Sequence, residues 1–159
     1  MHLHLAWLDA QQYRNTMRTT ATRYHDFSAG HRVYGHESKC AHLHGHNYRV
    51  HFTVTADALD SIGRVMDFSA IKEHLCEWLE DNWDHRMLLW EKDPMAKSVQ
   101  EIDPSGTVLV PFNPTAEAMA QYLVEVIAPA ALRNTGVRLI RCSIDETRKC
   151  SATFELSPS

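Results

Sequence analysis

The clearest pattern in the chain is a two-residue alternation of apolar and polar positions over residues 46–56. Alternation of this kind is typical of a strand with one buried and one exposed face. The candidate buried positions are His46, Tyr48, Val50, Phe52 and Val54, and the candidate exposed positions are Asn47, Arg49, His51, Thr53 and Thr55. Residues 19–28 are also compatible with a strand, and we expect Gly30 to end it.

Two later segments have the spacing of amphipathic helices, in which residues three and four apart share a face. We expect Asp67 or Ser69 to cap the first and Pro129 to end the second, which follows the turn-forming residues 113–115. The first apolar stripe is Ile71, Leu75, Trp78 and Leu79, and the second is Ala116, Met119, Ala120, Leu123, Val124 and Ile127.

The remaining segments complete a predicted order of β-β-α-α-β-β. Between the helices lies a long polar insertion, interrupted by a short apolar run at 108–112, and two strands are expected at 137–144 and 151–156. Strands that flank a pair of helices favour an α+β fold: an antiparallel four-stranded sheet with two helices on one face. Residues 1–16 fit no part of this pattern. We expect an N-terminal extension outside the core there, and a single domain over 17–159.

Composition excludes some classes of function. The chain has 159 residues with 16 Lys+Arg against 20 Asp+Glu, a formal net charge of -4, so the basic stripe of a nucleic-acid-binding protein is not expected. Its apolar runs are too short to span a membrane. The four cysteines form no CxxC pair, and we expect free thiols in a reducing cytoplasm. Eleven histidines, several of them clustered, point towards a metal.

The segment KCAHLHGHNY at 39–48 carries the strongest chemical signal. His44 and His46 share a parity and therefore project from the same face of a strand. Catalytic zinc commonly has three protein ligands and one position for water or substrate. His31 is the best candidate for the third ligand, with His36 and His42 as competitors.

Three other groups are candidates for chemistry. Cys40 lies four residues before His44 and could act as a nucleophile or base, or as a fourth ligand that closes a structural zinc site. Asp84 precedes His85, and a carboxylate near an imidazole can fix the tautomer of the ring. Adjacent residues do not normally face each other, however, so the dipeptide alone does not establish a pair. Glu146 and Thr147 follow a predicted strand and could bind a flat polar ligand.

Six motifs in this order resemble the family of 6-pyruvoyl-tetrahydropterin and 6-carboxytetrahydropterin synthases, from about residue 19 to residue 154. They are FSAGHR (27–32), KCAHLHGHNY (39–48), VMDF (65–68), DHRML (84–88), NPTAE (113–117) and DET (145–147). The resemblance implies the tunnelling fold (T-fold), in which sheets of three subunits join into a barrel and two trimers commonly stack into a hexamer. It also implies active sites between subunits.

The resemblance implies a role for each matching residue. His31, His44 and His46 match the zinc ligands, and Cys40 matches the proton-abstracting thiol. Asp84 and His85 match an acid–base pair, and Glu146 matches the carboxylate that anchors the pterin ring. Thr115, Glu117 and Thr147 match nearby positions of the substrate pocket.

The implied reaction starts from 7,8-dihydroneopterin triphosphate, with zinc as a Lewis acid. We favour the branch that releases acetaldehyde and triphosphate and forms 6-carboxy-5,6,7,8-tetrahydropterin, a lyase step on the route to queuosine. The alternative is the 6-pyruvoyl branch, which retains the side chain. Leu89, where relatives often have Asn, and the longer segment 90–111 are departures from the family pattern. More remote alternatives are a zinc hydrolase, in which Cys40 is a bystander, and a non-catalytic zinc-binding module.

Overall fold

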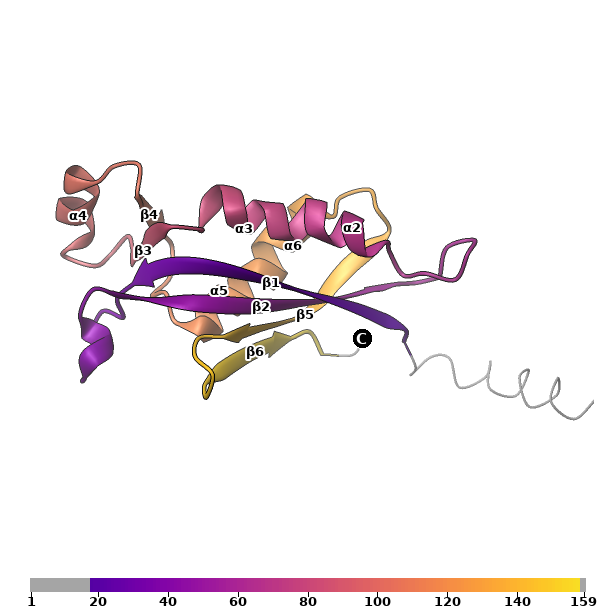
Figure 1. The fold of residues 1–159 in the computed structure, drawn as a ribbon, viewed down its shortest axis with the longest axis horizontal. Helices are drawn as coiled ribbons and strands as arrows, with labels where there is room; N and C mark the ends of the chain where they lie inside the picture. Colours follow the sequence, from indigo (N-terminus) through magenta and orange to yellow (C-terminus); the bar gives the residue numbers. More distant parts are fainter. Residues whose placement is uncertain (1–17, 158–159) are drawn as a thin grey trace, which may run out of the picture.

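Six strands form one curled sheet in the order β4-β3-β1-β2-β5-β6 (Figure 1). The computed structural model describes residues 18–157, so the extension expected over residues 1–16 lies outside the described residues. The strands are β1 (Thr20–His31), β2 (His44–Ala56), β3 (Arg86–Trp90), β4 (Thr107–Val110), β5 (Val137–Asp145) and β6 (Ser151–Glu155).

Four of these strands are the predicted antiparallel ones, and the α+β class is confirmed. β1 pairs with β2, β2 with β5 and β5 with β6, all antiparallel. The alternation in β2 has the predicted sense, because Tyr48, Val50 and Phe52 are buried while Arg49 is exposed. β1 is longer than predicted and continues through Gly30. A Cβ at this position would meet the end of the Met87 side chain, so the glycine allows a close approach and does not end the strand.

The sheet is larger than predicted by two strands. β3, the helix α4 (Ala96–Ile102) and β4 occupy much of the segment expected to be a polar insertion. β3 pairs parallel with β1, and β4 pairs parallel with β3. Leu88 and Leu89 are neighbours in sequence and both are fully buried, so this strand has no two-residue alternation that would have revealed it.

Two helical runs pack on the buried face of the sheet (Figure 1). The first is α2 (Phe68–Ile71), a π-helical segment η2 (Lys72–Cys76) and α3 (Glu77–Asn82). The second is α5 (Ala116–Tyr122), a π-helical segment η3 (Leu123–Ile127) and α6 (Ala128–Ala131). Asp67 caps the first run by accepting a hydrogen bond from the Ser69 N–H. Pro129 does not end the second run, because it falls in the first turn of α6, where a proline ring fits.

The core lies between the helices and the inward face of the sheet. Phe27 and Tyr48 stack with ring centroids 5.2 Å apart, and Trp83 packs 6.3 Å from Phe27. This aromatic group lies next to the ends of β1 and β2 that carry the histidines. None of the helices within residues 18–157 is long and apolar enough to cross a membrane.

Candidate metal centre

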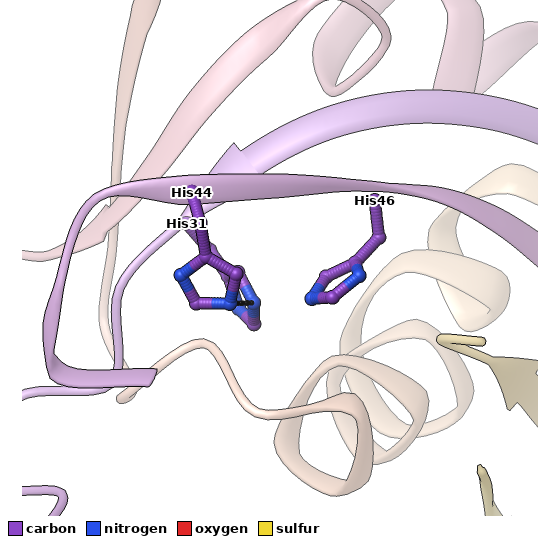
Figure 2. Close-up of side chains that lie close together, drawn as sticks. All are labelled: His31, His44 and His46. Carbon is purple, nitrogen blue, oxygen red and sulfur yellow. Dashed lines mark hydrogen bonds between the residues drawn. The ribbon is translucent and has the colours of Figure 1, made fainter. Parts of the chain in front are cut away.

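Three histidines converge where β1 ends and β2 begins. His31 and His44 are direct partners in the β1–β2 register, and His46 pairs with Ala29 two positions further on. Figure 2 shows the three rings projecting from the same side of the two strands towards one another. One ligand atom from each ring lies within 4.8 Å of the others. Residues His31, His44 and His46 could therefore hold a metal ion together.

Backbone carbonyls fix the proton positions of two of these rings. His31 Nδ1 lies 2.7 Å from the Pro114 carbonyl oxygen, and His44 Nδ1 lies 2.7 Å from the His42 carbonyl oxygen. A carbonyl oxygen can only accept a hydrogen bond, so each Nδ1 must carry the hydrogen. The Nε2 atom of each neutral ring is then left with a free lone pair.

The two lone pairs point at each other. His31 Nε2 and His44 Nε2 are 3.0 Å apart, and two acceptors at this distance repel unless a cation lies between them. His46 Nε2 is buried and has no hydrogen-bond partner among the described residues. Burial lowers the pKa of both His31 and His46, which favours the neutral form that binds metals. The donor set therefore fits a metal ion.

The Pro114 carbonyl is held in place by a pair of hydrogen bonds across the site. The Tyr34 N–H donates to Asn113 Oδ1 over 2.9 Å, and Asn113 Nδ2 donates to the Tyr34 carbonyl over 2.8 Å. Thr115 then caps α5 by accepting a hydrogen bond from the Ala118 N–H. Sequence reasoning missed the carbonyls that orient His31 and His44, because backbone groups leave no signal in the residue pattern. Oriented imidazoles of this kind are typical of metal sites.

Cys40 lies in η1 (Lys39–Ala41), in the connection between β1 and β2. Its carbonyl accepts a hydrogen bond from the Val33 N–H over 2.8 Å, and its thiol is free and partly buried. The group of ligating side chains found within residues 18–157 comprises the three histidines without Cys40. This geometry favours an open three-ligand site over the closed four-ligand one. His36 and His42 are likewise outside the group.

Asp84 and His85 contact each other although they are adjacent in sequence. Asp84 Oδ2 lies 2.6 Å from His85 Nδ1, and Asp84 Oδ1 accepts a hydrogen bond from the Ser28 N–H. The backbone of His85 is left-handed at this contact, with φ of 54°. Burial alone would raise the pKa of Asp84, but the Ser28 hydrogen bond and the contacts with His85 together lower it. Asp84 is therefore an ionised carboxylate that fixes the proton on His85 Nδ1.

This pair lies outside the ligating group formed by the three histidines. The His85 side chain is 80% exposed and lines a hollow together with Gly30, Gly45 and Met87 and with His44 and His46. A larger open groove of about 1150 Å³ runs from Asp84 and His85 to the turn between β5 and β6.

The other predicted residues lie around the same end of the sheet. Glu146 follows β5 and reaches the histidine cluster, where its Oε1 is 3.5 Å from His31 Nε2. Thr147 Oγ1 accepts hydrogen bonds from the Lys149 and Cys150 N–H groups and so shapes the β5–β6 turn. Glu117 is exposed in the first turn of α5.

Tyr48 is a member of the site that sequence reasoning assigned only to the core. Its ring lies 5.5 Å from the ring of His46 and 5.9 Å from that of His31. The hydroxyl is buried and has no hydrogen-bond partner among the described residues. Burial raises the pKa of Tyr48 well above its usual value, so the phenol stays protonated.

Comparison with known proteins identifies the relatives of this chain. The family model of 6-pyruvoyl tetrahydropterin synthase matches residues 20–157. The chain belongs to this family. A 6-carboxy-5,6,7,8-tetrahydropterin synthase from Rickettsia typhi is 35% identical over 130 residues, which cover 81% of this chain and 94% of the relative. A protein of the same name from Synechocystis is 41% identical over 118 residues, covering 65% and 92%. The resemblance seen in the six sequence motifs is thereby confirmed.

Solved structures share the fold of this chain. The 6-pyruvoyl tetrahydropterin synthase of Caenorhabditis elegans superposes with a TM-score of 0.62 at 25% identity, covering 89% of this chain and 97% of that one. An uncharacterized protein from Wolinella succinogenes superposes with a TM-score of 0.76 at 22% identity, covering 89% and 100%. The T-fold architecture expected from the resemblance is confirmed.

Proposed function

We propose that this protein is a zinc-dependent 6-carboxy-5,6,7,8-tetrahydropterin synthase. It converts 7,8-dihydroneopterin triphosphate into 6-carboxy-5,6,7,8-tetrahydropterin with release of acetaldehyde and triphosphate, on the route to queuosine. The observation that carries the proposal is the convergence of one ring nitrogen each from His31, His44 and His46. The curated relatives from Rickettsia typhi and Synechocystis bear the name of this activity, which supports the choice of branch.

The three histidines hold the zinc ion, which supplies Lewis-acid polarisation of substrate oxygen when it is bound. Cys40 removes a proton from the side chain of the pterin as a thiolate. Glu146 binds the amidine edge of the pterin ring through a bidentate pair of hydrogen bonds. We expect Thr115, Glu117 and Thr147 to contact the substrate as well.

The Asp84–His85 pair moves the proton that the reaction requires. Because ionised Asp84 holds the hydrogen on Nδ1, His85 presents Nε2 for proton transfer. The His85 side chain is 80% exposed and lies outside the group formed by His31, His44 and His46. His85 therefore serves the thiol and the metal of a neighbouring subunit, in a trimer or hexamer with active sites between subunits.

Product analysis tests the proposal. The zinc-loaded protein is incubated with 7,8-dihydroneopterin triphosphate, and acetaldehyde and the pterin product are quantified by enzymatic assay and by mass. We expect both acetaldehyde and 6-carboxy-5,6,7,8-tetrahydropterin, and we expect Cys40→Ala to abolish them. Cys150→Ala is the matched control, because Cys150 is a free, exposed thiol outside the histidine cluster. Absence of turnover by zinc-loaded protein contradicts the proposal.

The second candidate is 6-pyruvoyl-tetrahydropterin synthase activity, which the name of the matching family and the name of the Caenorhabditis elegans structure favour. This reaction also eliminates triphosphate but keeps all three carbons of the side chain. A pterin product of the corresponding mass without acetaldehyde assigns the protein to this branch.

A further inference from the structure

A buried ion pair joins the end of β1 to the segment 90–111, which departs from the family pattern. Arg32 directly follows His31, and its Nε atom lies 2.7 Å from Asp93 Oδ2. The Asp93 side chain is 0% exposed and that of Arg32 is 13% exposed. Neither of these two atoms has an aligned hydrogen bond among the described residues, so the contact is an attraction between opposite charges. A charge buried this fully needs a partner of opposite sign, and Asp93 therefore holds Arg32 in place.

Asp93 is itself fixed by the turn between β3 and α4. Its Oδ1 accepts a hydrogen bond from the Met95 N–H over 2.8 Å, and its carbonyl accepts one from the Ala96 N–H over 3.0 Å. The Arg32 guanidinium also contacts the Met95 sulfur. β3, which leads into this turn, pairs with residues 29–31 of β1 (Figure 1). The carboxylate is therefore presented to the end of β1 from a fixed position.

The three residues after His31 connect the end of β1 to two parts of the site. The second of them, Val33, donates its N–H to the Cys40 carbonyl over 2.8 Å. The third, Tyr34, exchanges two hydrogen bonds with the side chain of Asn113, and the next carbonyl along the chain orients the His31 ring. A displacement of these three residues therefore reaches both His31 and Cys40.

We propose that Asp93 is a positioning residue for the metal centre and acts through Arg32. It holds the three residues after His31, and with them the backbone of Cys40, in place. The inference rests on the proposed function, in which this histidine binds zinc and this thiol removes a proton. The ligating group found within residues 18–157 contains no residue of the segment 90–111, so the segment acts on the chemistry from outside the centre. Metal–ligand distances tolerate about 0.2 Å, so a small shift at the end of β1 weakens zinc binding.

Zinc affinity tests this role without turnover. The affinities of the wild type and Asp93→Asn are measured by competition with a chromophoric chelator, and urea unfolding verifies that each protein is folded. Asp93→Asn removes the charge but keeps an oxygen for the Met95 N–H. We expect it to lose roughly 10–100-fold in zinc affinity, as is typical when a group that orients a metal ligand is changed. Wild-type zinc affinity in folded Asp93→Asn overturns the proposal.

A double variant tests whether Asp93 acts through Arg32. Arg32→Gln/Asp93→Asn leaves no unpaired buried charge, so it also serves as the test if Asp93→Asn fails to fold. We expect its zinc affinity to be about as low as that of Asp93→Asn, because both remove the same contact. Wild-type zinc affinity in the double variant overturns the proposal. A loss equal to the product of the losses in Arg32→Gln and Asp93→Asn overturns the action through Arg32.

Two control variants separate positioning from a general loss of stability. Asp57→Asn removes an exposed carboxylate that is paired with Arg138 over 2.8 Å. Val54→Ala leaves a cavity at a fully buried position of β2, opposite Ala21 near the start of β1. We expect both to keep wild-type zinc affinity, Val54→Ala despite its lower stability in urea, because the metal centre of the folded chain is unchanged. A loss in Val54→Ala as large as that in Asp93→Asn overturns the positioning role.

The visible absorption of cobalt-loaded protein measures the geometry of the same centre. We expect Asp93→Asn to change the ligand-field bands and Asp57→Asn to leave them as in the wild type. Unchanged bands in Asp93→Asn overturn the proposal. The two proposals fail separately. Product formation by the wild type together with wild-type zinc affinity in Asp93→Asn rejects only the positioning role, whereas lost affinity in Asp93→Asn without any product from the wild type rejects only the catalytic assignment.

Discussion

Gly45 lies between His44 and His46, and its replacement by alanine should disturb the metal centre without removing any ligand. A Cβ at Gly45 would lie 3.0 Å from the Ala29 carbonyl oxygen in the neighbouring strand. Ordinary carbon–oxygen contacts between strands are about 3.3–3.6 Å, so β1 and β2 must separate by roughly 0.3 Å. The atoms nearest to this Cβ all belong to the backbone of Ala29 and Gly30, so no flexible side chain can move aside to absorb the shift.

The expected magnitudes follow from this displacement. Metal–ligand distances tolerate about 0.2 Å, and His31 lies on the strand that must move away from His44 and His46. We expect Gly45→Ala to lower zinc affinity by about 10-fold or more. Overpacking costs about 1–3 kcal/mol, and loss of the glycine's chain entropy returns about 0.5–1 kcal/mol, which leaves a net destabilisation of about 0–2.5 kcal/mol.

Gly30→Ala is the matched control for this substitution. Gly30 pairs directly with Gly45, but a Cβ there would meet chiefly the flexible end of Met87. Chelator competition for zinc affinity and urea unfolding for stability are measured on the wild type and both variants. Equal zinc affinity in Gly45→Ala and Gly30→Ala would refute the claim that the close approach of β1 and β2 sets the histidine geometry.

Three further predictions concern protonation and buried polar groups. Burial lowers the pKa of His31, so below the unfolded value of about 6.5 the unfolded chain binds more protons than the folded one. The free energy of urea unfolding of the metal-free protein should therefore fall as the pH is lowered from about 7.5 to about 5.5. His31→Asn should reduce the slope of this free energy against pH. An identical slope in the wild type and His31→Asn contradicts the prediction. Tyr48→Phe removes a buried hydroxyl without a partner among the described residues and should leave the free energy of unfolding unchanged or raise it by about 1 kcal/mol; a clear loss in urea unfolding would contradict this. Asp84→Asn should lower kcat by about 100-fold or more with zinc affinity unchanged, because His85 loses the charge that fixes its proton. The exposed Asp81→Asn should keep the wild-type kcat, and a wild-type kcat in Asp84→Asn would contradict the role of the pair.

The sequence was sufficient for the antiparallel strands and for the face of the histidine cluster. Side chains two apart on a strand must share a face, so the spacing alone assigns His44 and His46 to the same side as Tyr48. Their convergence with His31 required only the β1–β2 pairing, which a hairpin of two neighbouring strands provides. The six motifs were specific enough to identify the family.

Other features depend on tertiary contacts that no local pattern records. The strand β3 is five residues long and has adjacent buried leucines, so it lacks the alternation that revealed β2. The contact between Asp84 and His85 occurs where His85 has a positive φ, which is uncommon outside glycine and which the residue pattern does not indicate. The tautomers of His31 and His44 depend on carbonyls, one of them from a segment 83 residues away. These contacts form only in the folded chain, as where Pro114, just before α5, meets the end of β1.

The zinc K-edge X-ray absorption spectrum of the substrate-free, zinc-loaded protein tests the central claim most directly. The proposed centre contains nitrogen and oxygen ligands only, so we predict imidazole scattering with every ligand bond at about 2.0–2.2 Å. A sulfur contribution at about 2.3 Å would show that Cys40 closes the site. That result would contradict an open, catalytic centre held by His31, His44 and His46.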